Sequence, residues 1–355
     1  MTITGSGEST RVLPRAVLLM LGLAAGVVVI AGMKASAGIL GPAVLALMLV
    51  IAVHPLRDWL HRRGLPGWAT VTIALTVIYA ILLGLIAAMV VSVARFATIL
   101  PQYQGKFDEL LGQARQLLAQ YGVGEQQVQK ALNVDANRVF SVVGAALGST
   151  VSVLSALLLV ATLALFMAAD AAGYGRRLAV VERDRPQLVQ ALRTFSHGTR
   201  QYLLVSTVFG LIVAALDVMA LWIMGIPLPL LWGLLAFITN YIPNIGFVLG
   251  LVPPALLGLL EGGPVTMLIV IVVYSVINFV VQTVIQPKIV GDTAGLSVTL
   301  AMASLIFWGW VLGPLGALLA IPLTLLAKAM LVDADPAARW FGAFLTSKVH
   351  DDSAV

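Results

Sequence analysis

The sequence predicts an all-α, polytopic transmembrane protein with about eight helical spans, two of which are discontinuous helices. Of its 355 residues, 60% are hydrophobic and 10% are charged, whereas a soluble domain carries about 25% charged residues. Uncharged runs of about 20 residues, the length that crosses a bilayer, recur along the chain. Between residues 203 and 286 only Asp217 and Glu261 are charged, and six prolines interrupt that stretch. Apolar helices that stop and restart in this way are typical of transporters.

The spans follow from the uncharged runs, taken in order. We expect them at residues 16–33, 35–53, 68–94, 149–169, 202–224, 229–260, 265–286 and 297–330. The sixth is interrupted at Pro243 and the eighth around Gly313 and Pro314. Because the sixth run is longer than the roughly 20 residues needed to cross, we expect it to form two half-helices that meet inside the membrane.

The spans divide the chain into four regions. Residues 1–94 form an N-terminal transmembrane hairpin and third span, residues 95–148 an extracytoplasmic amphipathic helical segment, residues 149–332 a C-terminal transport core, and residues 333–355 a cytoplasmic tail. The core includes an amphipathic stretch near 176–200, in which Pro186 is a favourable first-turn residue. This stretch is interpreted as a cytoplasmic interfacial helix. Either amphipathic stretch, this one or the extracytoplasmic one, could alternatively be a plain connector.

Lysine and arginine set the expected orientation, because they are enriched in cytoplasmic loops. With both termini in the cytoplasm, 14 of the 21 basic residues lie inside, and seven, including Lys34 and Lys288, lie outside. The sequence therefore predicts a multi-pass membrane protein with both termini in the cytoplasm and with the lipid bilayer as its partner. The net charge of +5 suits an anionic cytoplasmic membrane face. Since the basic residues are spread over the loops, we expect no nucleic-acid partner.

No pattern in the sequence indicates an enzyme. The chain has no cysteine, which excludes disulfides, thiolate nucleophiles and Cys-ligated zinc. It contains no HExxH, Walker loop or GxSxG motif. His54 and His61 have no third ligand nearby, and Ser196-His197 has no orienting acid. We therefore expect no catalytic residue, no metal site and no cofactor, and transport that is either passive or driven by an ion gradient.

Two features of the predicted spans carry polar chemistry. Asp217 lies mid-way along the fifth span, about 10 Å of helix rise from Met224. A carboxylate there is expensive, so it is a candidate for ion coupling as a proton or cation site, or else a structural acid. Asn278, Gln282 and Gln286 follow at i, i+4 and i+8 on one helix face. Such a stripe either lines a solute path or joins helices through amide hydrogen bonds.

A second polar group surrounds the break at Pro243. Thr239, Asn240, Tyr241 and Asn244 flank carbonyls that the proline leaves without a helical donor. They would bind a small polar solute in mid-membrane or, alternatively, satisfy the break itself. The predicted substrate path consists of these residues, the stripe, and Gly246, Gly313 and Pro314. We expect Asn244→Leu to lower transport sharply and Asn278→Leu to have a smaller effect.

The C-terminal half resembles the AI-2E transporter family, the autoinducer-2 exporter-like proteins. The resemblance rests on residues 230–237, on Tyr241-Ile-Pro-Asn-Ile-Gly246, on Gln286-Pro-Lys-Ile-Val-Gly291 and on Gly313-Pro-Leu-Gly316. Phe247 departs from it, since many relatives have a proline there. The resemblance implies an exporter or exchanger of the bacterial inner (plasma) membrane that forms homo-oligomers, namely pentamers. It also implies one of two activities, export of a furanone-type quorum signal or exchange of sodium for protons.

The sequence as a whole thus predicts a transporter that exports a small polar metabolite or a signalling molecule of the autoinducer-2 type. One alternative is a monovalent cation (sodium)/proton antiporter, which requires Asp217 to face a wet cavity. The other is a non-transporting membrane scaffold. An intramembrane enzyme is disfavoured because no paired catalytic residues occur.

Overall fold

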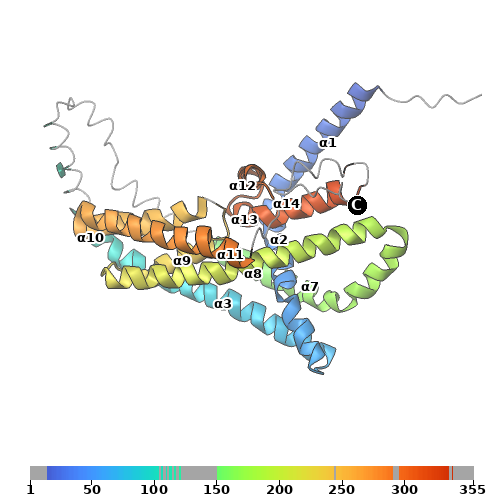
Figure 1. Cartoon of the computed structure of the whole chain (residues 1–355), viewed down its shortest axis with the longest axis horizontal. Coiled ribbons are helices and arrows are strands. Elements are labelled where there is room, and N and C mark those ends of the chain that lie inside the picture. Colours follow the sequence, from blue (N-terminus) through green and yellow to red (C-terminus); the bar gives the residue numbers. More distant parts are fainter. Residues whose placement is uncertain are drawn as a thin grey trace, which may run out of the picture.

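The computed structural model describes residues 14–103, 150–243, 245–290 and 296–335, together with parts of 105–120 and residue 338. These residues form helices and no β-strand, which confirms the all-α class (Figure 1). The helices are α1 (Arg15–Ala35), α2 (Ala37–Arg62), α3 (Gly67–Ile99), η1 (Leu100–Gln102), α7 (Thr150–Asp184), α8 (Pro186–Ile223), α9 (Pro229–Thr239), α10 (Ile245–Asn278), η2 (Phe279–Ile285), α11 (Gln286–Val290), α12 (Val298–Leu312), α13 (Pro314–Leu318), α14 (Ala320–Lys328) and η3 (Ala329–Asp333).

The predicted count of eight spans is not confirmed. In the described part of the chain, four helical runs are long and apolar enough to cross a membrane, and α7 makes a fifth if its two parts, bent by 65°, count as one span. The four are Ala37–Arg62, Gly67–Phe96, Pro186–Ile223 and Ile245–Ile289. Met20–Ala35, Pro229–Thr239 and Val298–Leu312 are shorter apolar helices. Of these, α9 has 11 residues and is about 16 Å long, well short of a hydrocarbon core of about 30 Å.

Residues 186–200 of the predicted interfacial helix continue without a break into the fifth span as α8, whereas residues 176–184 end α7. Pro186 stands in the first turn of α8, as the sequence predicts. At 38 residues α8 is about 57 Å long, so its N-terminal part extends beyond the membrane core. Ala191 and Phe195 on that part are buried in the core cluster of α2 and α14. Across the α7–α8 turn, Arg193 donates two hydrogen bonds of 2.8 Å to the Glu182 carboxylate.

Two Gly-Pro pairs reverse the chain between helices. Gly263 has φ +76° and ψ −170°, a conformation open essentially to glycine alone, and Pro264 begins the next arm. A Cβ on Gly258 would lie 3.2 Å from Val270 Cγ2, although 12 residues of straight helix rise about 18 Å. The run called α10 is therefore a hairpin with a first arm, 245–262, and a second arm, 264–278. Gly313, with φ +69°, makes a similar turn between α12 and α13.

The chain after α3 docks on the Gly263 turn. Tyr103 is 2% exposed and packs with the cluster that includes Trp232 and Leu257. Its hydroxyl hydrogen-bonds to the carboxylate of Glu261, and Lys106 Nζ lies 3.0 Å from the same carboxylate. Burial raises the pKa of Tyr103, so its hydroxyl keeps its proton. Residues 121–149, most of the predicted extracytoplasmic segment, and most of the predicted tail lie outside the described residues, so those two regions stay predictions.

The two halves of the predicted sixth span do not continue one another. Instead the first arm of α10 folds back against α9, so closely that a Cβ on Gly250 would lie 3.3 Å from Ala236 Cα. On its other side α9 packs against α8, where a Cβ on Gly233 would lie 3.2 Å from the Ala214 carbonyl oxygen. The helices α8, α9 and α10 therefore run alongside each other in one layer (Figure 1).

Candidate functional site

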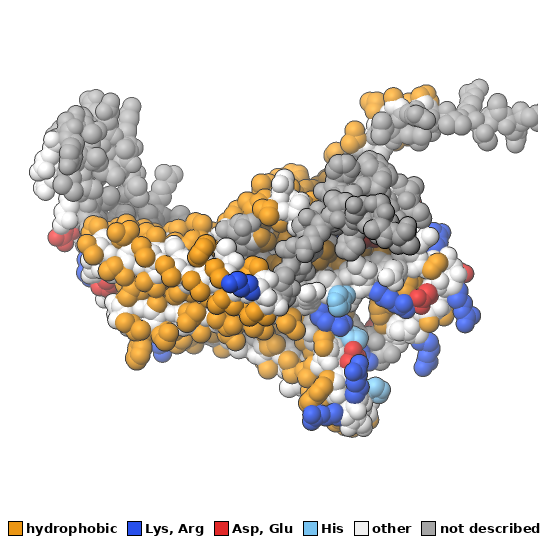
Figure 2. All heavy atoms as spheres, in the orientation of Figure 1, with side chains coloured by type: hydrophobic (Ala, Val, Ile, Leu, Met, Phe, Trp, Pro, Cys, Tyr) orange, Lys and Arg blue, Asp and Glu red, His pale blue; other side chains and the backbone are white. Residues whose placement is uncertain are grey.

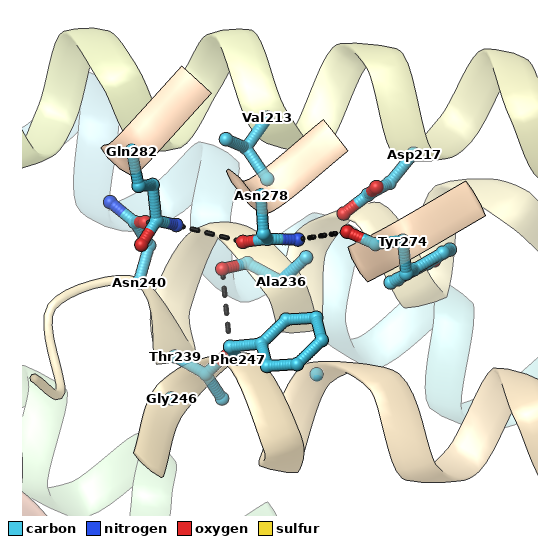
Figure 3. Close-up of a pocket in the computed structure, with 11 residues that line it drawn as sticks. Val213, Asp217, Ala236, Thr239, Asn240, Gly246, Phe247, Tyr274, Asn278 and Gln282 are labelled. Atoms are coloured by element: carbon cyan, nitrogen blue, oxygen red, sulfur yellow. Dashed lines mark hydrogen bonds between the residues drawn. The ribbon is translucent and has the colours of Figure 1, made fainter. Parts of the chain in front are cut away.

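Polar side chains from three helices meet where α8, α9 and α10 pack together. The residues that line one cavity are Asp217 of α8, Thr239 and Asn240 at the end of α9, Asn278 at the end of the second arm of α10, and Gln282 in η2. We call these five residues the polar cluster (Figure 3). The free space among them is about 10 Å³, room for about one water molecule. Residues that the sequence places up to 65 positions apart thus form one site.

Asn240 links two helices within the cluster. Its Nδ2 donates to the Ser206 carbonyl oxygen of α8 at 2.9 Å, and its Oδ1 accepts from Gln282 Nε2 at 2.8 Å. Gln282 Nε2 also lies 2.8 Å from Asn278 Oδ1, and Asn278 Nδ2 donates to the Tyr274 carbonyl oxygen one turn earlier. Gln282 belongs to the π-helical segment η2, and such segments occur frequently at functional sites.

Asp217 is the one charged member of the cluster. It is fully buried, and neither carboxylate oxygen has a hydrogen-bond partner among the described residues. The hydroxyl of Tyr274, which lines the same cavity, is also buried without a partner there. Figure 3 shows the Asp217 side chain directed from α8 toward Tyr274 and Asn278. An unpaired buried carboxylate is costly when ionised, so this site favours a proton, a cation or a donor group from a ligand.

Helix α9 and the first arm of α10 form a second hairpin, here called the α9–α10 hairpin. It depends on glycine where the two helices approach most closely. A Cβ on Gly246 would lie 1.9 Å from the Thr239 carbonyl oxygen, and a Cβ on Gly250 would lie 3.1 Å from Thr239 Oγ1. These glycines therefore let the first arm of α10 lie directly against the end of α9. That contact brings Thr239 and Asn240 to the face of α8.

We expect Gly246→Ala to destabilise the protein, because the contact is with backbone and neither side can rotate away. Overpacking of this kind costs about 1–3 kcal/mol. Thermal unfolding of the detergent-solubilised protein measures it. Gly84→Ala is the matched control, since a Cβ there meets nothing within 4 Å. Equal melting temperatures for the two variants would contradict the close contact.

Of the other predicted path residues, Gly246 also lines the cavity, whereas the described residues Tyr241, Pro243, Gln286, Gly313 and Pro314 do not. Tyr241 is in the turn, where its hydroxyl lies 2.6 Å from Thr207 Oγ1 and its carbonyl accepts from the Tyr202 hydroxyl at 2.7 Å. Pro243 is in the same turn, and Asn244 lies outside the described residues. Gln286 begins α11, and Gly313 and Pro314 form the α12–α13 turn. Ile242 packs against the cluster that contains Leu312 and Leu319.

Sequence reasoning missed three contributors to the site. Tyr274 continues the stripe of Asn278 and Gln282 one turn toward the N-terminus, so the four-residue spacing would have found it. Phe247 lines the cavity as well, at the position where the sequence departs from the family pattern. The Ser206 carbonyl, which binds Asn240, has no signal in the sequence because any residue supplies a carbonyl.

Comparison with known proteins identifies the family. The sequence profile of the AI-2E family transporter matches residues 23–334, which is most of the chain. The chain belongs to the AI-2E transporter family. The AI-2 transport protein TqsA of Escherichia coli K12 is 30% identical over 315 residues, covering 89% of this chain and 91% of TqsA.

Two further relatives of this AI-2E family member cover similar shares. YhhT of Escherichia coli K12, a candidate transport protein, is 29% identical over 313 residues, which is 87% of this chain and 89% of YhhT. A candidate transport protein of Haemophilus influenzae is 28% identical over 340 residues, or 94% and 97% of the two chains. The matched region contains the whole polar cluster, and the expected family resemblance is confirmed.

Proposed function

We propose that this AI-2E family transporter exports a small polar metabolite, such as a signalling molecule of the autoinducer-2 type, along a path that passes the polar cluster. The supporting observation is the convergence of four amide or hydroxyl side chains and one carboxylate between helices that are otherwise apolar. In a membrane such groups are costly unless they serve a solute path or join helices. The similarity to TqsA, an AI-2 transport protein, supports the same class of solute.

The path has to open for a metabolite to pass. A space of about 10 Å³ admits one water molecule, whereas a small-molecule site measures about 300–1,000 Å³. The α9–α10 hairpin is the part suited to move, because α9 is too short to cross the membrane. Opening would break the Asn240–Ser206 hydrogen bond, which holds α9 to α8 in the closed state. The break around Pro243 interrupts the helix at the hairpin tip, so the tip can act as a hinge.

We propose an inner-membrane location with both termini in the cytoplasm. Basic side chains gather at the end of the molecule where α2 ends and α7 meets α8 (Figure 2). The Gly263 turn lies on the opposite side, beside Tyr103 and Lys106 of the segment expected outside. From that turn the helical run 264–290 rises about 40 Å, which is enough to cross the membrane. In this orientation Lys288 therefore lies on the cytoplasmic side, whereas the eight-span prediction places it outside.

The orientation is tested by cysteine labelling, because the chain has no native cysteine. A membrane-impermeant maleimide applied to intact cells should label Gln126→Cys and leave Ser196→Cys and Lys288→Cys unlabelled. After permeabilisation all three should react. Labelling of Ser196→Cys on intact cells would reverse the proposed orientation.

A second candidate function is exchange of a monovalent cation such as sodium for protons. The observation that favours it is Asp217, a buried carboxylate without a partner in the described structure, beside a space of water size. A proton and a sodium ion fit that space without the opening that a metabolite requires. We further propose that the protein works as a homo-oligomer, a pentamer, which the mass of the detergent-solubilised protein would show.

Transport by the purified protein in liposomes tests both candidates. An exporter of the furanone class should accelerate flux of the autoinducer-2 signal compared with empty liposomes, with saturation at high concentration. An antiporter should instead acidify or alkalinise the lumen when a sodium gradient is imposed. If correctly assembled protein shows neither of these fluxes, the proposed function is contradicted and the scaffold interpretation remains.

A further inference from the structure

A second, much larger cavity lies between α2, α7 and α8, and it shares no residue with the polar cluster. Its volume is about 710 Å³, within the range of about 300–1,000 Å³ that small-molecule sites occupy. It is bounded by the bend of α7, by the N-terminal part of α8 and by the second half of α2. The solute path proposed above makes no use of it.

The walls of this cavity are amphipathic. Its apolar lining residues, here called the floor, include Val50, Met167 and Phe195. Its charged and histidine lining residues, here called the rim, are Arg177, Arg193 and Arg200, with two histidines and Asp170. Figure 2 shows basic and histidine side chains gathered on this end of the molecule.

The three rim arginines differ in whether their guanidinium groups have an acidic partner. Arg193 is bound by Glu182 through two hydrogen bonds, and Arg177 lies 3.9 Å from Asp170 in a pair that is mostly exposed. Arg200 has no ion pair among the described residues, and its Nε is buried without an acceptor. A buried guanidinium N–H without an acceptor is costly, so the cavity lacks an anionic group that a ligand would supply.

An anionic amphiphile fits both features. A small anion such as free phosphate would pair with Arg200 but leave the apolar floor exposed to water. A zwitterionic or neutral lipid would cover the floor but bring no excess negative charge to the rim. Arginine forks bind phosphate oxygens bidentately, and basic pockets between transmembrane helices on the cytoplasmic side bind anionic lipid headgroups.

We propose that this cavity binds one anionic phospholipid, with its phosphate at Arg200 and Arg177 and an acyl chain along the apolar floor. The lipid would join the bend of α7 to α8 and so stabilise the cytoplasmic end of the molecule. The source is the inner leaflet, since the cavity lies at the basic end of the molecule.

The test is thermal unfolding of the full-length protein in neutral detergent, titrated with a short-chain phosphatidylglycerol. We expect the melting temperature to rise by about 2–4 °C at saturation. Phosphatidylcholine of the same chain length should give little shift, and so should glycerol 3-phosphate or inorganic phosphate. An equal shift with phosphatidylcholine, or with inorganic phosphate alone, would overturn the lipid assignment.

Variants locate the binding site. Arg200→Gln should weaken the phosphatidylglycerol response at least about tenfold, since a hydrogen bond to a charged group is worth about 1.5–3 kcal/mol. Arg200→Lys, which keeps the charge but loses the fork, should have an intermediate effect. Arg62→Gln is the matched control, because Arg62 is exposed at the end of α2 and does not line the cavity.

Two outcomes separate this proposal from the solute path. Unchanged lipid affinity in Arg200→Gln protein that elutes and melts like the wild type would overturn the site. A raised KM for the transported solute in the same variant, without a change in lipid response, would make the cavity a solute vestibule and equally overturn it. Failure of transport in liposomes would contradict the proposed function but would not affect the lipid assignment, because the lipid titration requires no transport.

Discussion

Asn240→Leu is expected to reduce transport at least about tenfold while the protein still inserts and assembles. Leucine is similar in size but neither donates nor accepts a hydrogen bond. The variant leaves the Ser206 carbonyl and the Gln282 amide without their partner across the helix interface. Each of the two lost hydrogen bonds is worth about 0.5–1.5 kcal/mol, and 1.4 kcal/mol corresponds to a factor of ten.

The matched control is Asn278→Leu, which makes the same chemical change in the same cavity. The hydrogen bonds of Asn278 stay within its own helical run, to Tyr274 and Gln282, so its loss disturbs no contact between helices. We expect a smaller loss of transport, as the sequence also predicts. Flux in liposomes, normalised to the reconstituted protein, gives both values. If the two variants are equally impaired, Asn240 has no special role in joining the hairpin to α8.

The sequence-based prediction that Asn244→Leu impairs transport stays a prediction, since Asn244 lies outside the described residues. Asn240, one turn earlier, provides the structural counterpart to it. Oligomer size should be measured for each variant, so that loss of assembly is not mistaken for a blocked path.

The positions of the helix breaks could be predicted from the sequence, but their angles could not. Pro243, Pro264 and Pro314 each remove a backbone donor, and each stands where two helices are separated. A proline does not reveal whether the chain continues in the same direction or turns back. The chain reverses at Gly263 and Gly313, each directly before a proline, and both glycines have a positive φ. Glycine permits this conformation but does not require it, so the sequence alone does not predict the reversal.

This uncertainty in angle explains the span count. The run 229–260 is long enough to cross a membrane once, so apolar length alone makes it a single span. In the structure it holds a short helix and a returning arm, because Gly246 and Gly250 allow the two to touch. The two glycines are visible in the sequence, but the close contact that requires them is not. That contact is with Thr239 and Ala236, which lie there only after the chain has folded back.

The membership of the polar cluster was predictable to a larger extent. Polar residues are so rare in these helices that Asp217, Asn240, Asn278 and Gln282 stand out without a structure. Their convergence follows from packing, because α8 and the second arm of α10 contact the tip of α9 from different sides.

Asp217→Asn is expected to abolish the response of transport to an imposed proton gradient. Asparagine keeps the shape of the side chain but neither takes up nor releases a proton near neutral pH. Among the described residues, Asp217 is the only acidic one that lines the cavity, and none of them pairs with its carboxylate. If proton exchange at this carboxylate accompanies solute movement, the variant should transport at one rate whatever the direction of the gradient.

Two controls make that experiment decisive. Asp217→Glu retains a carboxylate and should retain the gradient response, even if its overall rate is lower. Glu261→Gln changes an acid at the Gly263 turn, where Tyr103 and Lys106 bind it and no contact with the cavity exists. It should therefore leave the gradient response unchanged. Flux in liposomes with imposed proton and sodium gradients, measured in both directions, provides the comparison. A wild-type protein without any gradient response, or an Asp217→Asn protein that retains it, would show that the buried carboxylate has a structural role and that coupling, where present, lies elsewhere.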